Sequence, residues 1–166
     1  EAVGITTDRL FIVPGNHGVN RDAAGRHDAV KRVFYHRDGY YDPKYGIINE
    51  ADLQALYVGQ KDFRDFLTEI YPEDRMKLYT NPAQPHFNIE TPDFNILHVD
   101  STLTYTKDQE ATDLILGTKL LQNALMTLNP DKPTILLSHY PFTSLHQDEK
   151  KYVRELLYKK GVRLWL

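Results

Sequence analysis

The chain has 166 residues, of which 41% are hydrophobic, so it is long enough to bury the core of one domain. Its 20 Lys and Arg against 23 Asp and Glu give a net charge of −3, which excludes a protein that binds nucleic acid through a bulk basic excess. There is no Cys, which excludes disulfides and thiolate metal sites, and no stretch approaches the roughly 20 apolar residues of a membrane-spanning helix. We therefore expect a cytoplasmic protein that does not bind membranes.

Strand and helix patterns alternate from the start of the chain. Residues 9–13 (RLFIV) are a short apolar run closed by Pro-Gly, which predicts a buried strand. Residues 22–35 predict a helix with Asp22 as its N-cap, although Gly25 interrupts the pattern. Residues 35–46 combine four tyrosines with Asp, Gly and Pro in no regular period, which predicts a loop.

The middle of the chain continues with a long helix, a hairpin and a second helix. Apolar residues recur at spacings of three and four over 53–70, and a Tyr-Pro pair ends that pattern. Residues 86–90 and 94–100 flank a Thr-Pro-Asp turn and predict two antiparallel strands. Residues 114–128 predict a helix despite the internal Gly117.

The last third predicts a strand at 134–138, a His-Tyr-Pro turn, a helix at 148–160 and a strand at 162–166. This alternation predicts a layered α/β fold in one domain over residues 1–166, with a helical, Tyr-rich insertion at about 36–85. Because the chain begins without Met and stops in a strand, we expect a domain that is incomplete at both ends. Exposed strand edges would then favour self-association or association with another domain.

Two histidines stand just beyond predicted strands. His17 follows the first strand in the sequence GNH, and His139 follows the strand at 134–138 in the sequence SHYP. In open α/β sheets, ligand sites form at the carboxyl ends of the strands. Together with the amide oxygen of Asn16, the two imidazoles suit a divalent metal with mixed oxygen and nitrogen ligands, or proton transfer.

The segments VPGNHGVNR and LLSHYP, with ILHVDS between them, resemble the calcineurin-like metallophosphoesterases. That family carries five short motifs, of which this chain has the third, Gly-Asn-His, and the fourth, a His shortly before Pro. The resemblance implies a layered α/β sandwich of the metallophosphoesterase type. It also implies that the complete domain is a hydrolase, a phosphatase or phosphodiesterase that attacks a phosphoester substrate with metal-activated water.

The same resemblance implies a role for each of three residues. Asn16 and His139 would ligate one metal of a centre that holds two divalent ions, either Mn, Fe or Zn. His17 would not be a ligand but would be catalytic, either stabilising the transition state or protonating the leaving oxygen. The chemistry is coherent, because two metals can hold a hydroxide nucleophile and the phosphate oxygens while an imidazolium neutralises the leaving group.

The chain departs from the family pattern at several points. Gly18 stands where the family has an acidic residue and Tyr140 where a second His is frequent, and the motifs Asp-x-His, Gly-Asp-x-x-Asp and Gly-His-x-His are absent. A catalytic metal usually has about three protein ligands or more. We therefore expect metal binding by this segment alone to be weak or absent, and the segment alone to be inactive.

Three other interpretations stay open. The chain could be a non-catalytic, decayed phosphoesterase-like domain that serves as an interaction or regulatory module. It could instead bind a lone zinc ion weakly through His17 and His139. The sequence PGNHG alone is also compatible with a tight turn that has Gly and Asn at positive φ.

The other polar candidates are expected to have structural roles. His98 lies within a predicted strand and is expected to be packed or to face solvent, and Asp100-Ser101 is typical of a strand-end cap. The Tyr-rich loop at 35–46 could stack on a nucleotide or a nucleic-acid base, although such tyrosines usually cover a core. Surface or structural roles are expected for the remaining histidines, His27, His36, His86 and His146.

Overall fold

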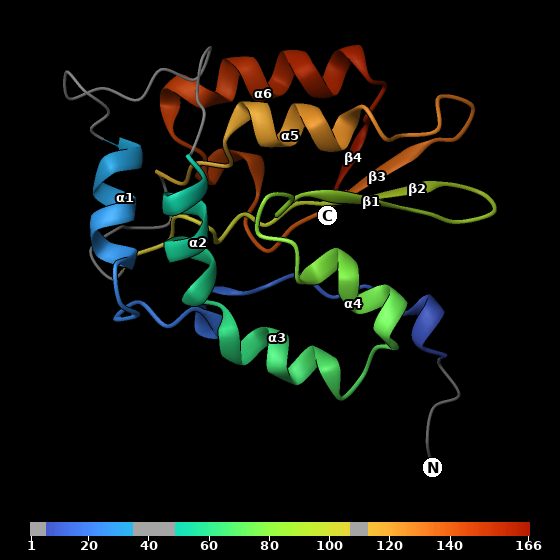
Figure 1. The fold of residues 1–166 in the computed structure, drawn as a ribbon. Helices are drawn as coiled ribbons and strands as arrows, with labels where there is room; N and C mark the ends of the chain where they lie inside the picture. Colours follow the sequence, from blue (N-terminus) through green and yellow to red (C-terminus); the bar gives the residue numbers. More distant parts are fainter. Residues whose placement is uncertain (1–5, 35–48, 107–112) are drawn as a thin grey trace.

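The computed structural model describes residues 6–34, 49–106 and 113–166 and places a sheet between helices (Figure 1). The sheet has four strands in the order β1-β2-β3-β4. These are β1 (Phe87–Glu90), β2 (Asn95–His98), β3 (Thr134–Leu137) and β4 (Leu164–Trp165). Strands β1 and β2 are antiparallel, whereas β2, β3 and β4 run parallel. The predicted α/β class and the predicted hairpin are confirmed.

Helices cover both faces of this sheet (Figure 1). On one face, α5 (Thr118–Leu125) and α6 (Gln147–Lys159) pack against Leu97 and Leu136 of the sheet. The opposite face packs through Phe87 against side chains of α3 (Lys61–Thr68) and α4 (Glu73–Tyr79). A third apolar cluster joins the remaining helices, α1 (Arg26–Phe34) and α2 (Glu50–Val58).

The predicted strand at residues 9–13 is wrong. Residues 10–15 belong to no strand in the described part of the chain, and the carbonyl groups of Leu10 and Ile12 accept hydrogen bonds from side chains. Tyr71 Oη donates to Leu10 O at 2.9 Å, and Tyr79 Oη donates to Ile12 O at 3.1 Å. These phenol groups are the hydrogen-bond partners that the backbone of a neighbouring strand would otherwise provide. The apolar pattern of residues 9–13 does not reveal which partners their carbonyl groups have.

The single helix predicted over 53–70 is two helices, α2 and α3, because the chain breaks at Gly59. The Gly59 carbonyl accepts a hydrogen bond from Asn20 N at 2.6 Å. A Cβ atom at position 59 would lie 2.8 Å from Arg26 Cδ and 2.9 Å from Asn20 O, so a side chain does not fit there. Helix α4, which follows Pro72, is not among the predicted elements.

The helix predicted over 114–128 begins only at Thr118. Gly117 precedes it with φ +80°, a conformation that L side chains rarely adopt. The amides of Leu116 and Gly117 donate to the buried Glu149 carboxylate at 2.7 and 2.8 Å. This carboxylate holds the segment before α5 outside the helix.

The predicted insertion at 36–85 is described only over residues 49–85, where α2, α3 and α4 lie. The Tyr-rich loop and His36 lie outside the described residues. None of the described helices combines the length and the apolar character that a membrane span requires.

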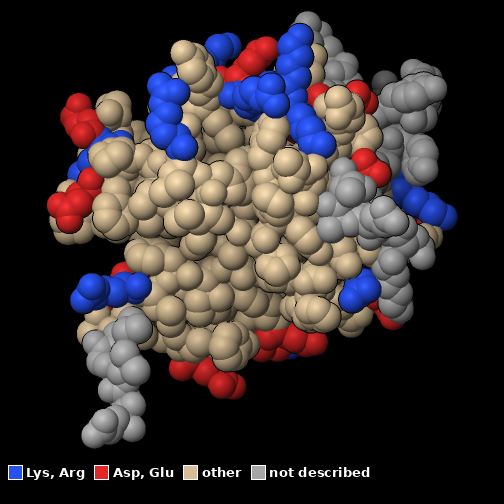
Figure 2. All heavy atoms as spheres, turned by 180° about the vertical axis from the view of Figure 1, so that it is seen from behind, with Lys and Arg blue, Asp and Glu red and all other residues tan. Residues whose placement is uncertain are grey.

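Charge is unevenly distributed over the molecule. Figure 2 shows Lys and Arg side chains gathered along the side where α6 lies, and Asp and Glu along the side of α3. The sequence of α6 and the turn after it accounts for the first group, with Lys150, Lys151, Arg154, Lys159, Lys160 and Arg163. Asp and Glu also lie at the top and left of this view, so neither side carries charges of one sign alone.

Candidate metal centre

Asn16 and His139 lie in contact although they are 123 positions apart in the sequence. His139 Nε2 lies 3.1 Å from Asn16 Oδ1. Asn16 begins the 3-10 turn η2 (Asn16–Gly18), and His139 follows β3 directly after Ser138. The fold therefore brings together the two side chains that the family resemblance assigns to one metal.

The turn that carries Asn16 is closed by its own backbone. Gly18 N donates to Gly15 O at 3.0 Å, and Val19 N donates to Asn16 O at 3.3 Å. Gly15 has φ −98°, and the described glycines with positive φ do not include Gly15 or Gly18. The segment PGNHG therefore does form a tight turn, but the positive φ expected at its glycines is wrong.

The loop that carries His139 is held by hydroxyl groups on both sides. Ser101 is fully buried, and its Oγ accepts a hydrogen bond from Tyr140 N at 2.9 Å. Ser138 Oγ donates to Tyr140 O at 2.7 Å and accepts from Trp165 Nε1 at 2.6 Å. The backbone around His139 is thus fixed by β3, by the segment after β2 and by β4.

His17 lies on the same turn as Asn16, and its side chain is exposed. No hydrogen bond or ion pair joins its side chain to another described residue. The arrangement leaves the imidazole available to a group bound beside Asn16 and His139.

The geometry of the pair fits one edge of a metal coordination shell. Two ligand atoms at about 2.1 Å from one metal are separated by about 3.0 to 3.4 Å at octahedral or tetrahedral angles. The observed 3.1 Å between Asn16 Oδ1 and His139 Nε2 falls within that range. Within residues 6–34, 49–106 and 113–166, however, no group of three or more His, Cys, Asp or Glu could hold a metal ion. The described residues therefore supply part of a centre.

Asp100 is a carboxylate near this loop, but its oxygens are already occupied. Oδ1 accepts from Thr102 N and Thr102 Oγ1, both at 2.9 Å, and Oδ2 accepts from Gln60 Nε2 at 2.6 Å. Asp100 is buried and caps the end of β2. The prediction of a strand-end cap is confirmed.

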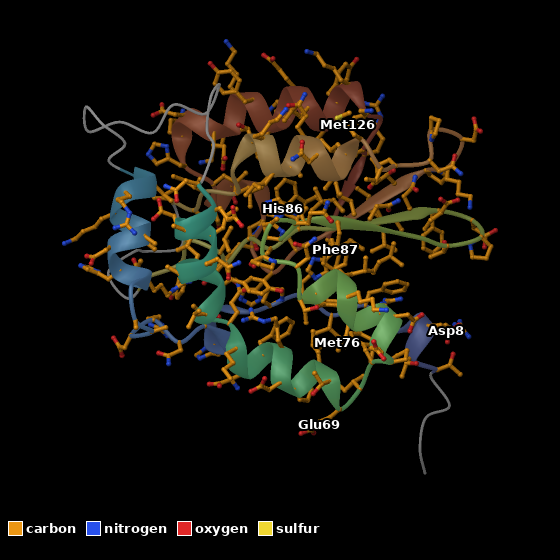
Figure 3. All side chains as sticks on the ribbon, in the orientation of Figure 1. Asp8, Glu69, Met76, His86, Phe87 and Met126 are labelled. Atoms are coloured by element: carbon orange, nitrogen blue, oxygen red, sulfur yellow. The ribbon has the colours of Figure 1, made fainter. Side chains whose placement is uncertain are left out.

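Two more histidines are buried in the structure. His86 Nε2 donates to Leu116 O at 2.8 Å, while its Nδ1 accepts from Asp100 N at 3.1 Å. Figure 3 shows His86 in the centre of the molecule, between α4 and α5. Burial lowers the pKa of His86, and burial lowers the pKa of His98 to about 3. Both are therefore neutral packed residues, which confirms the structural role expected for His86 and the packed alternative for His98.

Two residues that the sequence patterns did not single out, Tyr105 and Arg21, are linked to His139 through Tyr140. Tyr140 contacts the His139 ring edge to face, with 4.7 Å between centroids, and stacks on Tyr105 at 5.7 Å. The guanidinium carbon of Arg21 lies 5.3 Å from the centre of the Tyr105 ring. Arg21, Tyr105 and Tyr140, called here the aromatic row, come from separate segments, so no local periodicity could have revealed the row.

Comparison with known proteins gives a consistent result. A family model described as "Calcineurin-like phosphoesterase" matches residues 2–166. The chain is also 22% identical, over 167 aligned residues, to the "Uncharacterized metallophosphoesterase-like protein YydB" of Bacillus subtilis (strain 168). That alignment covers 93% of this chain and 31% of the relative, so the chain spans about a third of the relative's length. No solved structure matches the chain.

Proposed function

The chain belongs to the calcineurin-like phosphoesterase family, and from this premise we propose that the whole protein hydrolyses phosphoester bonds as a metal-dependent phosphatase or phosphodiesterase. The observation that carries the proposal is the contact of 3.1 Å between Asn16 Oδ1 and His139 Nε2. It joins the two family motifs that the chain contains, and both atoms are suitable ligands for a divalent metal.

In this proposal Asn16 and His139 hold one of two divalent metals, and Mn, Fe and Zn all accept an amide oxygen beside an imidazole nitrogen. Bound metals would supply a strong nucleophile at neutral pH and positive charge for the phosphate oxygens. His139 must offer the lone pair of Nε2, so its ring carries the proton on Nδ1 when the site is loaded. The remaining ligands have to come from outside the described residues.

His17 is the proposed proton donor to the leaving oxygen. It adjoins Asn16 on the same turn and is exposed, so its imidazole can reach a phosphoester held at the pair. A side chain at Gly18 would meet Phe63 Cβ at 3.4 Å. That is an ordinary van der Waals distance, so packing does not by itself require glycine at this position. Gly18 has no carboxylate that could orient His17, so another part of the protein has to orient it.

A non-catalytic, decayed domain is the second candidate. The observation that favours it is that the described residues bring together two metal-binding side chains rather than three or more. In that case the Asn16–His139 hydrogen bond only fastens the turn to the loop after β3. Weak zinc binding by His17 and His139 ranks below both, because no described contact joins these two side chains.

The activity itself provides the test. The full-length protein should hydrolyse p-nitrophenyl phosphate or bis-p-nitrophenyl phosphate when Mn²⁺, Fe²⁺ or Zn²⁺ is added. His139→Ala should lower turnover by about 100-fold or more, whereas His27→Ala, an exposed change on α1, should leave it unchanged. If no tested metal supports hydrolysis of either ester, the decayed domain is the better account.

Several finer expectations stay predictions. They are the preference for manganese, the choice between monoester and diester, inactivity of this segment alone, a nucleotide or nucleic-acid partner, self-association and a cytoplasmic location. The sheet offers one physical reason for self-association, because β4 pairs with β3 alone among the described strands and carries the exposed Leu164.

A further inference from the structure

Two buried side chains hold the segment that leads to Asn16. Tyr79 Oη and His98 Nε2 both donate to the carbonyl oxygen of Ile12, at 3.1 and 3.0 Å. Tyr79 is 5% exposed and His98 is 2% exposed, so both hydrogen bonds are shielded from water. Ile12 lies four residues before Asn16, and the buried Pro14 between them restricts the backbone. A fixed Ile12 carbonyl therefore fixes where the turn η2 begins.

The earlier part of the segment is held in the same way. Tyr71 Oη and Arg75 Nη2 donate to the carbonyl oxygen of Leu10, at 2.9 and 3.0 Å. Tyr71, Arg75 and Tyr79 all belong to α4 or to the bend just before it, within the helical part of the predicted insertion. Because residues 10–15 have no strand partner among the described residues, these side chains supply the hydrogen bonds that a strand would supply elsewhere.

His98 also connects this segment to the other half of the proposed metal site. Strands β2 and β3 are parallel, and their register pairs His98 with Leu137, two residues before His139. The His98 ring stacks on Phe87 of β1 with 4.2 Å between centroids, which fixes its direction. The sheet thus sets the position of the turn η2, through His98 and Ile12, and the position of His139, through β3.

The segment passes close to the His139 imidazole. A Cβ atom at Gly15 would lie 3.4 Å from both Cε1 and Nδ1 of His139. A displacement of this backbone would therefore change the separation of 3.1 Å between Asn16 Oδ1 and His139 Nε2. Metal-ligand distances vary by only about 0.2 Å, so such a displacement would weaken a metal bound by the pair.

We propose that Tyr79 and His98 are positioning residues of the metal centre, which keep Asn16 at the separation from His139 that two ligands of one metal need. They act through the Ile12 carbonyl and touch neither the metal nor the substrate. The inference rests on the proposed function, because Asn16 and His139 are ligands only if that proposal holds.

Hydrogen exchange in the metal-free, full-length protein measures how firmly the turn is held. The amides of Gly18 and Val19 close the turn, and mass spectrometry of peptides that cover residues 15–20 follows their exchange in EDTA. A double variant, Tyr79→Phe with His98→Phe, keeps two aromatic rings and removes both donors. We expect this exchange to be about tenfold faster or more in the double variant.

A conservative replacement separates the lost donor from a change in packing. Gln can place an amide N–H near the position of the His98 Nε2–H group, whereas Phe cannot. Tyr79→Phe with His98→Gln should therefore exchange more slowly in the turn than the double variant. Equal exchange in the two would contradict a role for the His98 hydrogen bond.

Metal affinity gives the second measurement. Mn²⁺ is titrated by calorimetry into the wild type and the double variant, each freed of metal beforehand. The affinity should fall by about tenfold or more in the double variant, as for other residues that orient metal ligands.

Thr104→Val is the matched control for a general loss of stability. Thr104 is fully buried, and its Oγ1 accepts from Ile115 N at 2.9 Å and donates to Ile115 O at 3.2 Å. This variant therefore also loses two buried hydrogen bonds, away from residues 10–15. It should unfold at a lower temperature but keep the wild-type exchange of the turn and the wild-type Mn²⁺ affinity. If it matches the double variant in both, destabilisation explains the effects and the positioning role is refuted.

The outcomes separate this inference from the proposed function. If the wild type binds Mn²⁺ and hydrolyses bis-p-nitrophenyl phosphate, but the double variant keeps either the exchange rate or the Mn²⁺ affinity of the wild type, the positioning role is refuted and the phosphoesterase stands. If the wild type binds no metal while the double variant exchanges faster in the turn, Tyr79 and His98 do hold the turn, and the proposed function is refuted.

Discussion

Replacement of Arg26 by Met tests whether one buried guanidinium holds together the segments behind the site. Arg26 is 1% exposed and donates to the carbonyls of Leu56 at 2.6 Å, Leu103 at 2.9 Å and Tyr105 at 2.9 Å. It thus ties α1 to α2 and to the aromatic row. Met is similarly long and apolar but has no donor, so Arg26→Met leaves these three carbonyl groups, and that of Thr102 at the longer distance of 3.4 Å, without this donor.

The expected loss of stability is a difference of two terms. Three hydrogen bonds from a charged donor contribute about 2 kcal/mol each, or roughly 6 kcal/mol together. Desolvation lowers the pKa of Arg26 from its ordinary value to about 10 despite the nearby Asp100, which corresponds to about 3 kcal/mol of cost that Met avoids. We therefore expect the free energy of unfolding to fall by about 3 kcal/mol.

Urea denaturation followed by circular dichroism at pH 7.5 measures this change. Lys31→Met on the same helix is the matched control, because Lys31 is exposed, and it should alter the free energy of unfolding by less than about 0.5 kcal/mol. If Arg26→Met is also within about 0.5 kcal/mol of the wild type, the hydrogen bonds of Arg26 do not stabilise the fold as reasoned.

Three further predictions concern buried groups around the site. His98, whose pKa burial lowers to about 3, stays neutral in the folded state while the unfolded chain gains a proton below pH 6.5. The free energy of unfolding should therefore fall on acidification, by about 1.4 kcal/mol at pH 5.5 from this group alone. If His98→Phe shows the same dependence of unfolding free energy on pH as the wild type, His98 is not the cause of that fall. Ser101→Ala removes the acceptor of the Tyr140 amide and should cost about 1 to 2 kcal/mol in thermal unfolding, whereas Ser101→Thr keeps the hydroxyl and should cost less. Glu149→Leu leaves the amides of Leu116 and Gly117 unpaired and should lower the free energy of unfolding by about 3 kcal/mol or more. Glu149→Gln keeps one oxygen, so its free energy of unfolding should lie between those of Glu149→Leu and the wild type.

Local patterns in the sequence predicted those parts of the fold that depend on local chemistry. The hairpin of β1 and β2 and the strand β3 follow from apolar runs bounded by turn residues. The strand predicted at 9–13 failed because the partners of Leu10 and Ile12 are the side chains of Tyr71 and Tyr79, more than fifty positions away. Periodicity cannot report a partner at that distance.

The same distinction applies to the site. Asn16 and His139 were singled out because each stands in a short motif, and the structure places them in contact. The aromatic row was missed because Arg21 and Tyr105 meet only through the fold. Gly59 was not recognised as a break, because the pattern around it continues and the crowding comes from Asn20 and Arg26.

The measurement that tests the central claim most directly is the metal content of four versions of the full-length protein after dialysis against Mn²⁺. The account predicts about two metals per chain in the wild type and a clear loss in Asn16→Ala and His139→Ala. His17→Ala should keep the wild-type metal content and lose hydrolysis of bis-p-nitrophenyl phosphate, because His17 is proposed to donate a proton rather than to bind metal. A wild-type protein that holds no metal, or unchanged metal content in both ligand variants, would contradict the account.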